Sequence, residues 1–307
     1  MTVIAACTNK KKLPACDKLR IDNYQAESLP ILAFIWNRAL NEVESVRLPA
    51  IELYIGDHAQ SIRQLRQLLV ENGENTRLYY LSAGYGFLAC DSKIKPYSAT
   101  FANGTRDSIS DRIRGLVKTP IDMRVWVENL HNRMPNPEKM DLPIVVIASR
   151  SYLDAFRIDL TKIVSTLKTP TDFLVVTSSP PAWLKELGVE PLETFQAMRL
   201  IVGGSLLSLN ARVGLSLFKD GPASSQEVRN RYERLTRNCV PIPPLPKRSK
   251  PTEKQIRQFI AEYQKKNSRP TKSRALRELR DSKHWQCEQA RFSDLFFKMS
   301  EGKNGHK

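Results

Sequence analysis

One stretch in the first third of the chain gathers residue types that could hold a ligand. Residues 78–101 read LYYLSAGYGFLACDSKIKPYSATF, and the apolar run at the start is typical of a buried strand. Two glycines, two further tyrosines, the carboxylate of Asp91 and a Pro-Tyr pair follow it. Glycine lets a backbone approach a ligand closely, and tyrosine supplies both a ring and a hydroxyl group. The stretch therefore predicts a binding site rather than a simple connection.

Polar and basic residues also follow the other runs that read as strands. The runs are TVIAAC (2–7), LYYLSA (78–83), LPIVVIAS (142–149) and DFLVVTSS (172–179). In an open parallel sheet, ligands bind outside the carboxyl ends of the strands. We therefore expect one cleft at these ends, lined by Asn9, Lys10, Ser82, Tyr85, Asp91, Ser149 and Arg150. The alternative is that these ends are polar only because the chain turns into solvent there.

Several enzyme classes are disfavoured by motifs that the chain lacks. It has no GxxxxGK[ST] sequence for a P-loop, no GxGxxG after the first strand run, and neither GxSxG nor HExxH. The four histidines and five cysteines have no metal-binding spacing. We therefore expect neither a metal nor a cofactor. Any catalysis would have to use carboxylates, hydroxyls, amides and the backbone.

Amphipathic stretches alternate with the strand runs. ILAFIWNRALNEV (31–43) and HAQSIRQLRQLLVEN (58–72) place apolar residues three and four positions apart, which is typical of helices. This alternation predicts an α/β fold with a mostly parallel sheet sandwiched by helices. The five prolines of VPIPPLPKRSKP indicate an extended linker. We expect an α/β domain over 1–239, the linker over 240–251, and a C-terminal module over 252–307.

The positive charge of the chain is concentrated in this module. The chain has 48 basic and 32 acidic residues, a net charge of +16, and residues 247–307 hold 17 of the basic and 7 of the acidic ones. Such an excess favours a polyanionic partner, because phosphate contacts release counterions. We expect that partner to be DNA. The alternatives are a solvated basic tail or, for the whole chain, an anionic membrane surface.

The module contains stretches that read as short amphipathic helices. They are TEKQIRQFIAEYQKKN (252–267), RPTKSRALRELRDS (269–282) and CEQARFSDLFFKM (287–299). This order is the outline of a helix-turn-helix or winged-helix module. We expect its DNA contacts to come from Arg274, Arg277, Arg280, Gln289 and Arg291. The alternative is a helical bundle that packs on the main domain.

The sequence also favours a cytoplasmic protein without a membrane segment. The longest apolar runs are well short of the ~20 residues that a membrane span needs. No basic region precedes the apolar run at the start, so a secretory signal is not expected. The scattered cysteines indicate a reducing compartment.

The loops after the first two strand runs resemble those of a known family. Residues 7–12 read CTNKKK, residues 81–88 read LSAGYGFL, and Ile94 and the pair Pro96-Tyr97 follow. These motifs resemble α/β proteins related to the peroxide-stress protein YaaA and to the core of archaeosine synthase. More distant relatives have uracil-DNA glycosylase-like folds. Residues 203–212, GGSLLSLNAR, are similar to a late helix of this group.

The resemblance covers about residues 1–220 and implies a pocket for a nucleobase or nucleoside. This chain departs from the family at Gly84, where relatives have a lysine, and at Ser98, where they have an acidic residue. A base pocket needs rings to stack on and polar groups for the base edge. The expected base-binding residues are Ser82, Tyr85, Phe87 and Tyr97, with Asn9 as a further contact. The alternative for the tyrosines is half-buried packing.

Together these features predict a DNA glycosylase that excises a modified or non-standard base, in defence against foreign DNA such as that of a phage. Cleavage of the glycosidic bond passes through a cationic sugar, which a carboxylate stabilises. We expect Asp91 to be this carboxylate, with Asp107 or Asp154 as alternatives, and Asn9 to position water or the base. The expected phosphate contacts of the α/β domain are Lys10, Lys11, Arg150 and Arg212.

A function from another class remains open. The chain could be a DNA-binding regulator without catalytic activity, whose α/β domain senses a nucleotide or a modified base. Asp91 would then be an ordinary turn residue.

Overall fold

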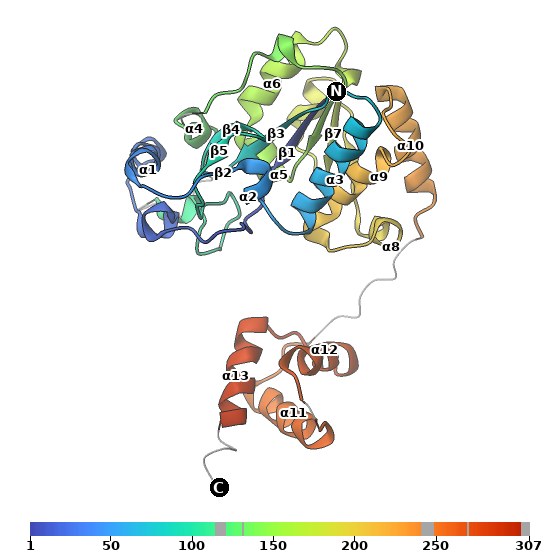
Figure 1. The fold of residues 1–307 in the computed structure, drawn as a ribbon. Coiled ribbons are helices and arrows are strands. Elements are labelled where there is room, and N and C mark those ends of the chain that lie inside the picture. The colour runs from blue at the N-terminus through green and yellow to red at the C-terminus, as the bar shows by residue number, and fades with distance from the viewer. Residues whose placement is uncertain (114–120, 131, 241–248, 269, 302–307) are drawn as a thin grey trace. The chain divides into compact units, whose positions relative to one another are not determined.

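The computed structural model describes residues 1–113, 121–130, 132–240, 249–268 and 270–301 (Figure 1). The chain divides into two compact units, Met1–Pro241 and Ile242–Lys307. This division lies inside the expected linker 240–251, of which residues 241–248 are outside the described residues. We call the units the α/β unit and the helical unit.

The α/β unit is built around a six-stranded sheet with the order β4-β3-β1-β6-β7-β8. The strands are β1 (Thr2–Ala6), β3 (Arg77–Ser82), β4 (Gly86–Ala89), β6 (Ile144–Ile147), β7 (Phe173–Thr177) and β8 (Leu192–Glu193). All neighbouring pairs are parallel except β3 and β4. The predicted α/β fold with a mostly parallel sheet is therefore confirmed. The antiparallel edge strand β4 was not predicted.

The centre of the sheet is the strand nearest the N-terminus. All five residues of β1 are buried, as expected for a strand that is covered on both faces. Its neighbours β3 and β6 run in register with it, so that Ala6 pairs with Leu81 and Ala5 with Ile147. The chain passes from β1 to β3 on one side and later to β6 on the other. The strand order therefore reverses at the carboxyl end of β1, where such sheets bind ligands.

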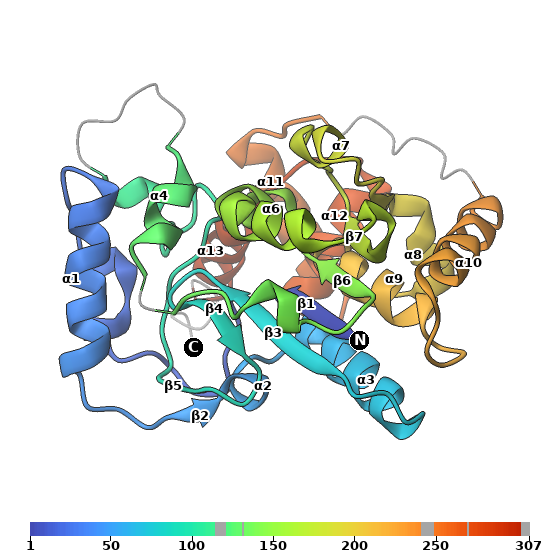
Figure 2. The same ribbon diagram turned by 90° about the horizontal axis from the view of Figure 1, so that it is seen from above.

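Helices cover both faces of the sheet. Figure 2 shows α6 (Arg157–Thr166) on one face, and α3 (Asp57–Glu71) and α9 (Leu209–Leu217) on the other. A Cβ atom at Gly214 would lie 2.6 Å from Ile147 Cδ1, so this glycine lets α9 approach β6 closely. The predicted helices 31–43 and 58–72 correspond to α1 (Leu29–Glu42) and α3.

Further helices and a pair of short strands complete the α/β unit. The remaining α-helices are α2 (Ala50–Leu53), α4 (Met123–Glu128), α5 (Arg150–Ala155), α7 (Trp183–Glu186), α8 (Arg199–Val202) and α10 (Ser225–Arg237). Strands β2 (Leu48–Pro49) and β5 (Lys93–Ile94) form a separate antiparallel pair. Among the described residues no single helix could cross a membrane, although the bent pair Gln196–Val202 and Leu206–Leu217 meets that test by length and composition.

The helical unit has an apolar core of its own. It consists of α11 (Glu253–Lys266), α12 (Lys272–Ser282) and α13 (Gln289–Glu301), close to the three predicted helices. Thr252 and Gln255 form a capping box that satisfies free backbone N–H groups at the start of α11. The core consists of Ile256, Phe259, Ile260, Tyr263, Ala275, Leu276, Leu279, Cys287, Phe292, Leu295 and Phe296. The expected linker is shorter than predicted, because the backbone of Ser249 already bonds to that of His284 and Gln286.

Candidate functional site

Buried hydroxyl and thiol groups meet at the carboxyl ends of β1 and β3. We call Cys7, Tyr54, Ser82, Tyr97 and Tyr152 the hydroxyl cluster. Tyr97 Oη lies 2.8 Å from Ser82 Oγ and 3.0 Å from Tyr54 Oη. Cys7 Sγ lies 3.4 Å from Tyr97 Oη and 3.3 Å from Tyr152 Oη. The cluster thus connects the ends of β1 and β3 to α5, which follows β6, at the reversal of strand order.

Burial keeps the phenols of this cluster neutral. Desolvation raises the pKa values of Tyr54, Tyr97 and Tyr152 well above the ordinary tyrosine range. At neutral pH each phenol is therefore a hydrogen-bond donor and acceptor rather than an anion. The cluster can orient polar groups, but its phenols are not prepared to act as bases.

Lys11 lies beside the cluster and is held by its own loop. Its Nζ is 4.1 Å from the centroid of the Tyr97 ring and donates to the carbonyl oxygens of Thr8 and Asn9 at 3.3 and 3.2 Å. Desolvation lowers the pKa of Lys11, and the charges of Cys7 and Asp107 partly oppose this shift. Lys11, which the sequence predicted to contact a phosphate, is thus bound to its own loop and lies beside the Tyr97 ring. The side chains of Asn9 and Lys10, two further predicted site residues, are exposed.

Two tryptophans fix the glycine-containing loop after β3. Trp36 Nε1 donates to the carbonyl oxygen of Gly84, and Trp126 Nε1 donates to that of Ala83, both at 2.7 Å. A Cβ atom at Gly84 would lie 2.5 Å from two ring atoms of Tyr97. At Gly86, which has a φ of +85°, it would lie 2.6 Å from the carbonyl oxygen of Asn132. The glycines therefore make room for the protein's own groups, whereas the sequence predicted that they admit a ligand.

We expect the variant Gly84→Ala to lower the free energy of unfolding by about 1–3 kcal/mol, because its methyl group would overpack the Tyr97 ring. Denaturant titration measures this loss. In the background Tyr97→Leu, which removes the ring, the same substitution should cost much less. Equal costs in the two backgrounds would show that the ring is not the obstacle.

The predicted base-binding residues do not form one open pocket. Ser82 and Tyr97 are buried in the hydroxyl cluster. Phe87 is 4% exposed and packs in the core against Tyr79 and Phe156, with ring centroids 5.5 and 6.4 Å away. Tyr85 remains partly exposed and lines a cavity, which we describe below. Of this group, Tyr85 alone has the accessibility that stacking on a base requires.

Asp91 lies near the start of β3, at the end of this strand opposite to the hydroxyl cluster. Strand β4 is antiparallel to β3, with Ser82 opposite Gly86 and Tyr79 opposite Ala89. The chain therefore returns along β3 before it reaches Asp91, whose side chain is exposed. The structure does not bring Asp91 together with the hydroxyl cluster, because β4 runs antiparallel to β3 and returns the chain to the start of β3 just before Asp91. This placement does not fit the catalytic role that the sequence predicted for Asp91.

A cavity of about 750 Å³ opens beside α5, and we call it the Asp154 cavity. Its lining includes Asp111, Asp122, Arg124, Ser151, Asp154 and Arg157, together with the ring of Phe101. Phe101 packs edge to face on Tyr152, with centroids 5.0 Å apart. The wall of the Asp154 cavity is therefore in contact with the hydroxyl cluster.

Hydrogen bonds orient the carboxylates of this cavity. Asp154 Oδ1 accepts from the indole Nε1 of Trp183 at 2.9 Å, and its Oδ2 lies 3.4 Å from Arg150 Nε. Arg124 donates to Asp122 and thereby lowers the pKa of that carboxyl. The predicted phosphate contact Arg150 is exposed but pairs with Asp154. Sequence reasoning had singled out the strand-end loop 149–152, and Asp154 lies one helical turn beyond Arg150.

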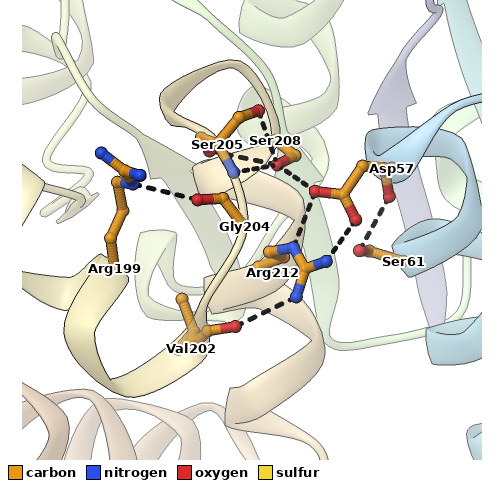
Figure 3. A network of polar contacts seen from close by, with 8 residues as sticks. All are labelled: Asp57, Ser61, Arg199, Val202, Gly204, Ser205, Ser208 and Arg212. Carbon is orange, nitrogen blue, oxygen red and sulfur yellow. Dashed lines mark hydrogen bonds and ion pairs between the residues drawn. The ribbon is translucent and has the colours of Figure 1, made fainter. Parts of the chain in front are cut away.

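Arg212 has a structural role that the sequence did not reveal. Its guanidinium forms a two-pronged ion pair with Asp57, with 2.8 Å between Nε and Oδ2, and Ser208 Oγ donates to the same carboxylate (Figure 3). Gly204, with a φ of +80°, leaves room for the guanidinium, since a Cβ atom there would overlap it. This network joins α3 to α9. Arg212, which the sequence predicted to contact a phosphate, is therefore paired with a carboxylate of the protein.

His58, in the first turn of α3, has an environment unlike that of a surface histidine. Its Nε2 lies 3.1 Å from the carbonyl oxygen of Ala6, the last residue of β1. Desolvation lowers the pKa of His58 to about 4, from 6.5 for a free side chain. The native protein therefore holds this imidazole neutral at pH values where the unfolded chain has already protonated it.

Because the folded pKa is the lower one, we expect the contribution of His58 to stability to be complete above pH 6.5 and to be lost as the pH falls towards 4. The loss should amount to about 3 kcal/mol of unfolding free energy. Denaturant titrations across this window measure it, with His58→Gln as the comparison. If the variant keeps the same slope between pH 6.5 and 4, the titrating group is another residue.

The helical unit exposes most of the predicted DNA contacts. Arg274 and Arg277 on α12 and Gln289 and Arg291 in the first turn of α13 are exposed. Arg280 differs, because its guanidinium donates to the carbonyl oxygen of Cys287 at 2.7 Å. That bond ties α12 to the segment before α13. Arg280 therefore has a structural role at least in part. The four exposed side chains are better placed to contact a phosphate or the edge of a base.

Comparison with known proteins identifies no relative. No protein-family model, curated protein or solved structure matches the chain. Among the residues that the structure describes, no group of three or more His, Cys, Asp or Glu side chains is arranged to hold a metal ion. The functional interpretation therefore depends on the geometry of the two units.

Proposed function

We propose that the chain is a DNA glycosylase that excises a modified or non-standard base and leaves an abasic site. The observation that carries the proposal is the Asp154 cavity. It has the size of a small-molecule site, lies beside α5 at the carboxyl edge of the sheet, and combines carboxylates with arginines in its lining. The positively charged helical unit supplies the second requirement, which is affinity for the DNA backbone.

The chemistry asked of the cavity is hydrolysis of an N-glycosidic bond. The flipped nucleotide would enter the cavity, where Phe101 forms part of the wall. As the bond from C1′ to nitrogen breaks, its electrons leave with the base, which takes up a proton, and the sugar becomes cationic. The Asp154 carboxylate would stabilise that charge and accept a proton from the water that attacks C1′. Its bonds to Trp183 and Arg150 fix its direction.

The arginines of the cavity have a complementary role. The guanidinium groups of Arg124 and Arg157 line the same space as Asp154. We assign them to the phosphates that flank the flipped nucleotide, since guanidinium groups bind phosphate oxygens through paired hydrogen bonds. Each is also near a protein carboxylate, Asp122 for Arg124 and Glu186 for Arg157 at 3.5 Å. Binding of DNA would therefore exchange or share these partners.

We also propose a finer assignment of the fold and of the biological setting. The α/β unit would belong to the uracil-DNA glycosylase-like architecture, supported by the resemblance of loops 7–12 and 81–88 to the YaaA-related proteins. Excision of a base that the host does not use would serve defence against phage DNA. The substrate class, a modified base, follows from this setting rather than from the cavity.

Incubation with duplexes that contain modified or unmodified bases, followed by heating in alkali, tests the activity. We expect strand breaks only after the alkali treatment and only in duplexes with the cognate base, because abasic sites break under these conditions. Absence of breaks across a broad panel of modified bases would contradict the proposal.

A second candidate function has one observation in its favour. The cavity carboxylates Asp111, Asp122 and Asp154 all accept hydrogen bonds from groups of the protein. Asp111, for example, accepts from the backbone N–H of Gly104 at 3.2 Å. A site whose carboxylates are already occupied suits recognition better than catalysis. The chain would then be a DNA-binding regulator that senses a nucleotide or a modified base. Selective binding of a modified duplex without abasic sites would support it.

A further inference from the structure

A second cavity lies at the β4 edge of the sheet. It has a volume of about 300 Å³ and is lined by residues of the segment at the end of α1, of β4 and of β5, together with Asn132. We call it the Tyr85 cavity. It shares no lining residue with the Asp154 cavity, so the two are separate candidate sites.

The charged residues that line the Tyr85 cavity are all cations. Arg47, Lys93 and Lys95 line it, and no carboxylate does. Arg47 and Lys93 are exposed, and neither forms an ion pair within the part of the chain that the structure describes. Glu44 is close enough for its charge to act on Lys95, but it does not line the cavity. Among the described residues, two cations that line the cavity thus have no ion-pair partner, which favours an anionic ligand.

Lys95 has a different task from the other two cations. It is 4% exposed, and its ammonium group donates to the carbonyl oxygens of Leu40 and Asn41 in the last turn of α1. A cation at this end of a helix is favourable for the macrodipole and satisfies free carbonyl groups. Lys95 therefore fixes the cavity wall, while Arg47 and Lys93 remain to bind a ligand.

An aromatic ring of fixed orientation forms another part of the wall. Tyr85 Oη accepts from the backbone N–H of Lys95 at 3.0 Å, and its ring packs edge to face on Tyr97 with centroids 5.3 Å apart. Asn132 donates to the carbonyl oxygen of Tyr85 and so fixes the backbone as well. Leu88 and Ile94 add apolar surface. A ring held in this way needs no reordering when a planar group stacks on it.

We propose that the Tyr85 cavity binds a phosphorylated nucleoside, with the base against Tyr85 and the phosphate between Arg47 and Lys93. The volume is at the small end of the range for ligand sites and suits one nucleotide. This site goes beyond the proposed excision activity, because it is separate from the Asp154 cavity. The ligand is either a free nucleotide or the terminal nucleotide of a 5′-phosphorylated strand.

Isothermal titration calorimetry on the full chain tests the proposal. The probes are adenosine, guanosine, cytidine and thymidine 5′-monophosphates, the same nucleosides without phosphate, and inorganic phosphate. We expect at least one monophosphate to bind about tenfold or more tightly than its nucleoside and than phosphate, since charge-assisted bonds and stacking both contribute. Equal binding of inorganic phosphate would overturn the assignment of a base site, and no binding of any monophosphate would overturn the whole proposal.

Variants locate the site. The double variant Arg47→Gln and Lys93→Gln should weaken nucleotide binding by about tenfold or more while base excision remains unchanged. The matched control is Lys168→Gln with Lys185→Gln, which removes the same charge from two other exposed positions. Unchanged affinity in the Arg47 and Lys93 variant, or an equal loss in the control, would contradict the assignment.

A competition experiment identifies the source of the ligand. A 5′-phosphorylated oligonucleotide is added to the complex of the protein with the best monophosphate, and an unphosphorylated one serves as the control. Displacement by the phosphorylated strand alone assigns the cavity to a DNA end. If neither strand displaces the monophosphate, the cavity is assigned to the free nucleotide. Displacement by both strands would contradict a site that requires the phosphate.

Discussion

Replacement of Asp154 by asparagine is expected to lower the rate of base excision by about a hundredfold or more while duplex affinity changes little. The amide has the shape of the carboxylate, and its oxygen can still accept from the indole of Trp183, so the cavity should keep its form. It lacks the negative charge that would stabilise the cationic sugar. Single-turnover excision assays and a DNA-binding titration on the same preparation measure the two effects.

The matched control for this experiment is Asp91→Asn. Asp91 is an exposed aspartate in the same unit but near the start of β3, so its replacement should leave excision at the normal rate. A normal rate for the Asp154 variant would remove Asp154 from the mechanism, and a slow Asp91 variant would restore the prediction made from sequence. A thermal melt of each variant shows whether a low rate comes from unfolding.

Removal of residues 242–307 is expected to weaken duplex binding by a hundredfold or more at physiological salt, with a smaller dependence on salt concentration. The helical unit has its own apolar core, and the α/β unit does not share it, so the truncated chain should still fold. Each phosphate contact that is lost lowers the log–log slope of affinity against salt by about 0.9 on duplex DNA. Binding titrations at several salt concentrations measure that slope.

Charge variants of the full chain distinguish a defined surface from general attraction. Arg274→Gln with Arg277→Gln removes two charges from the exposed side of α12, whereas Lys265→Gln with Lys266→Gln removes two from the end of α11. If α12 and α13 form the DNA surface, the first pair should reduce affinity and slope more than the second. An unchanged slope after truncation would refute the role of the helical unit.

Sequence patterns were sufficient for the main layers of the fold because its strands are long apolar runs. The runs at 2–7, 78–83, 142–149 and 172–179 all contain strands, and every residue of β1, β6 and β7 is buried. They were insufficient for β4, whose four residues follow a three-residue turn and have no period of their own. Because β4 was not predicted, Asp91 was expected at the carboxyl ends of the parallel strands, whereas the antiparallel direction of β4 places it near the start of β3.

Of the candidate site, the sequence could predict only the location, at the carboxyl ends of β1, β3 and β6. The rule that ligands bind at carboxyl ends led to Ser82 and to the loop 149–152, but it cannot show which side chains another segment will occupy. Arg212 illustrates the limit, because its partner Asp57 is 155 positions away in the chain. A basic residue reads the same in sequence whether it faces a phosphate or a carboxylate of its own chain. Burial and pairing are properties of the folded chain alone.

The central position of β1 has a consequence for synthesis on the ribosome. The strand that needs two parallel neighbours is translated before either of them, and the second neighbour begins at Ile144. At about 5–20 residues per second, roughly 7–28 s pass before β6 has been made. During that interval the apolar residues 2–6 have an unpaired edge, which is a condition for aggregation and for binding by chaperones. Expression yield should therefore respond to the elongation rate and to chaperone supply.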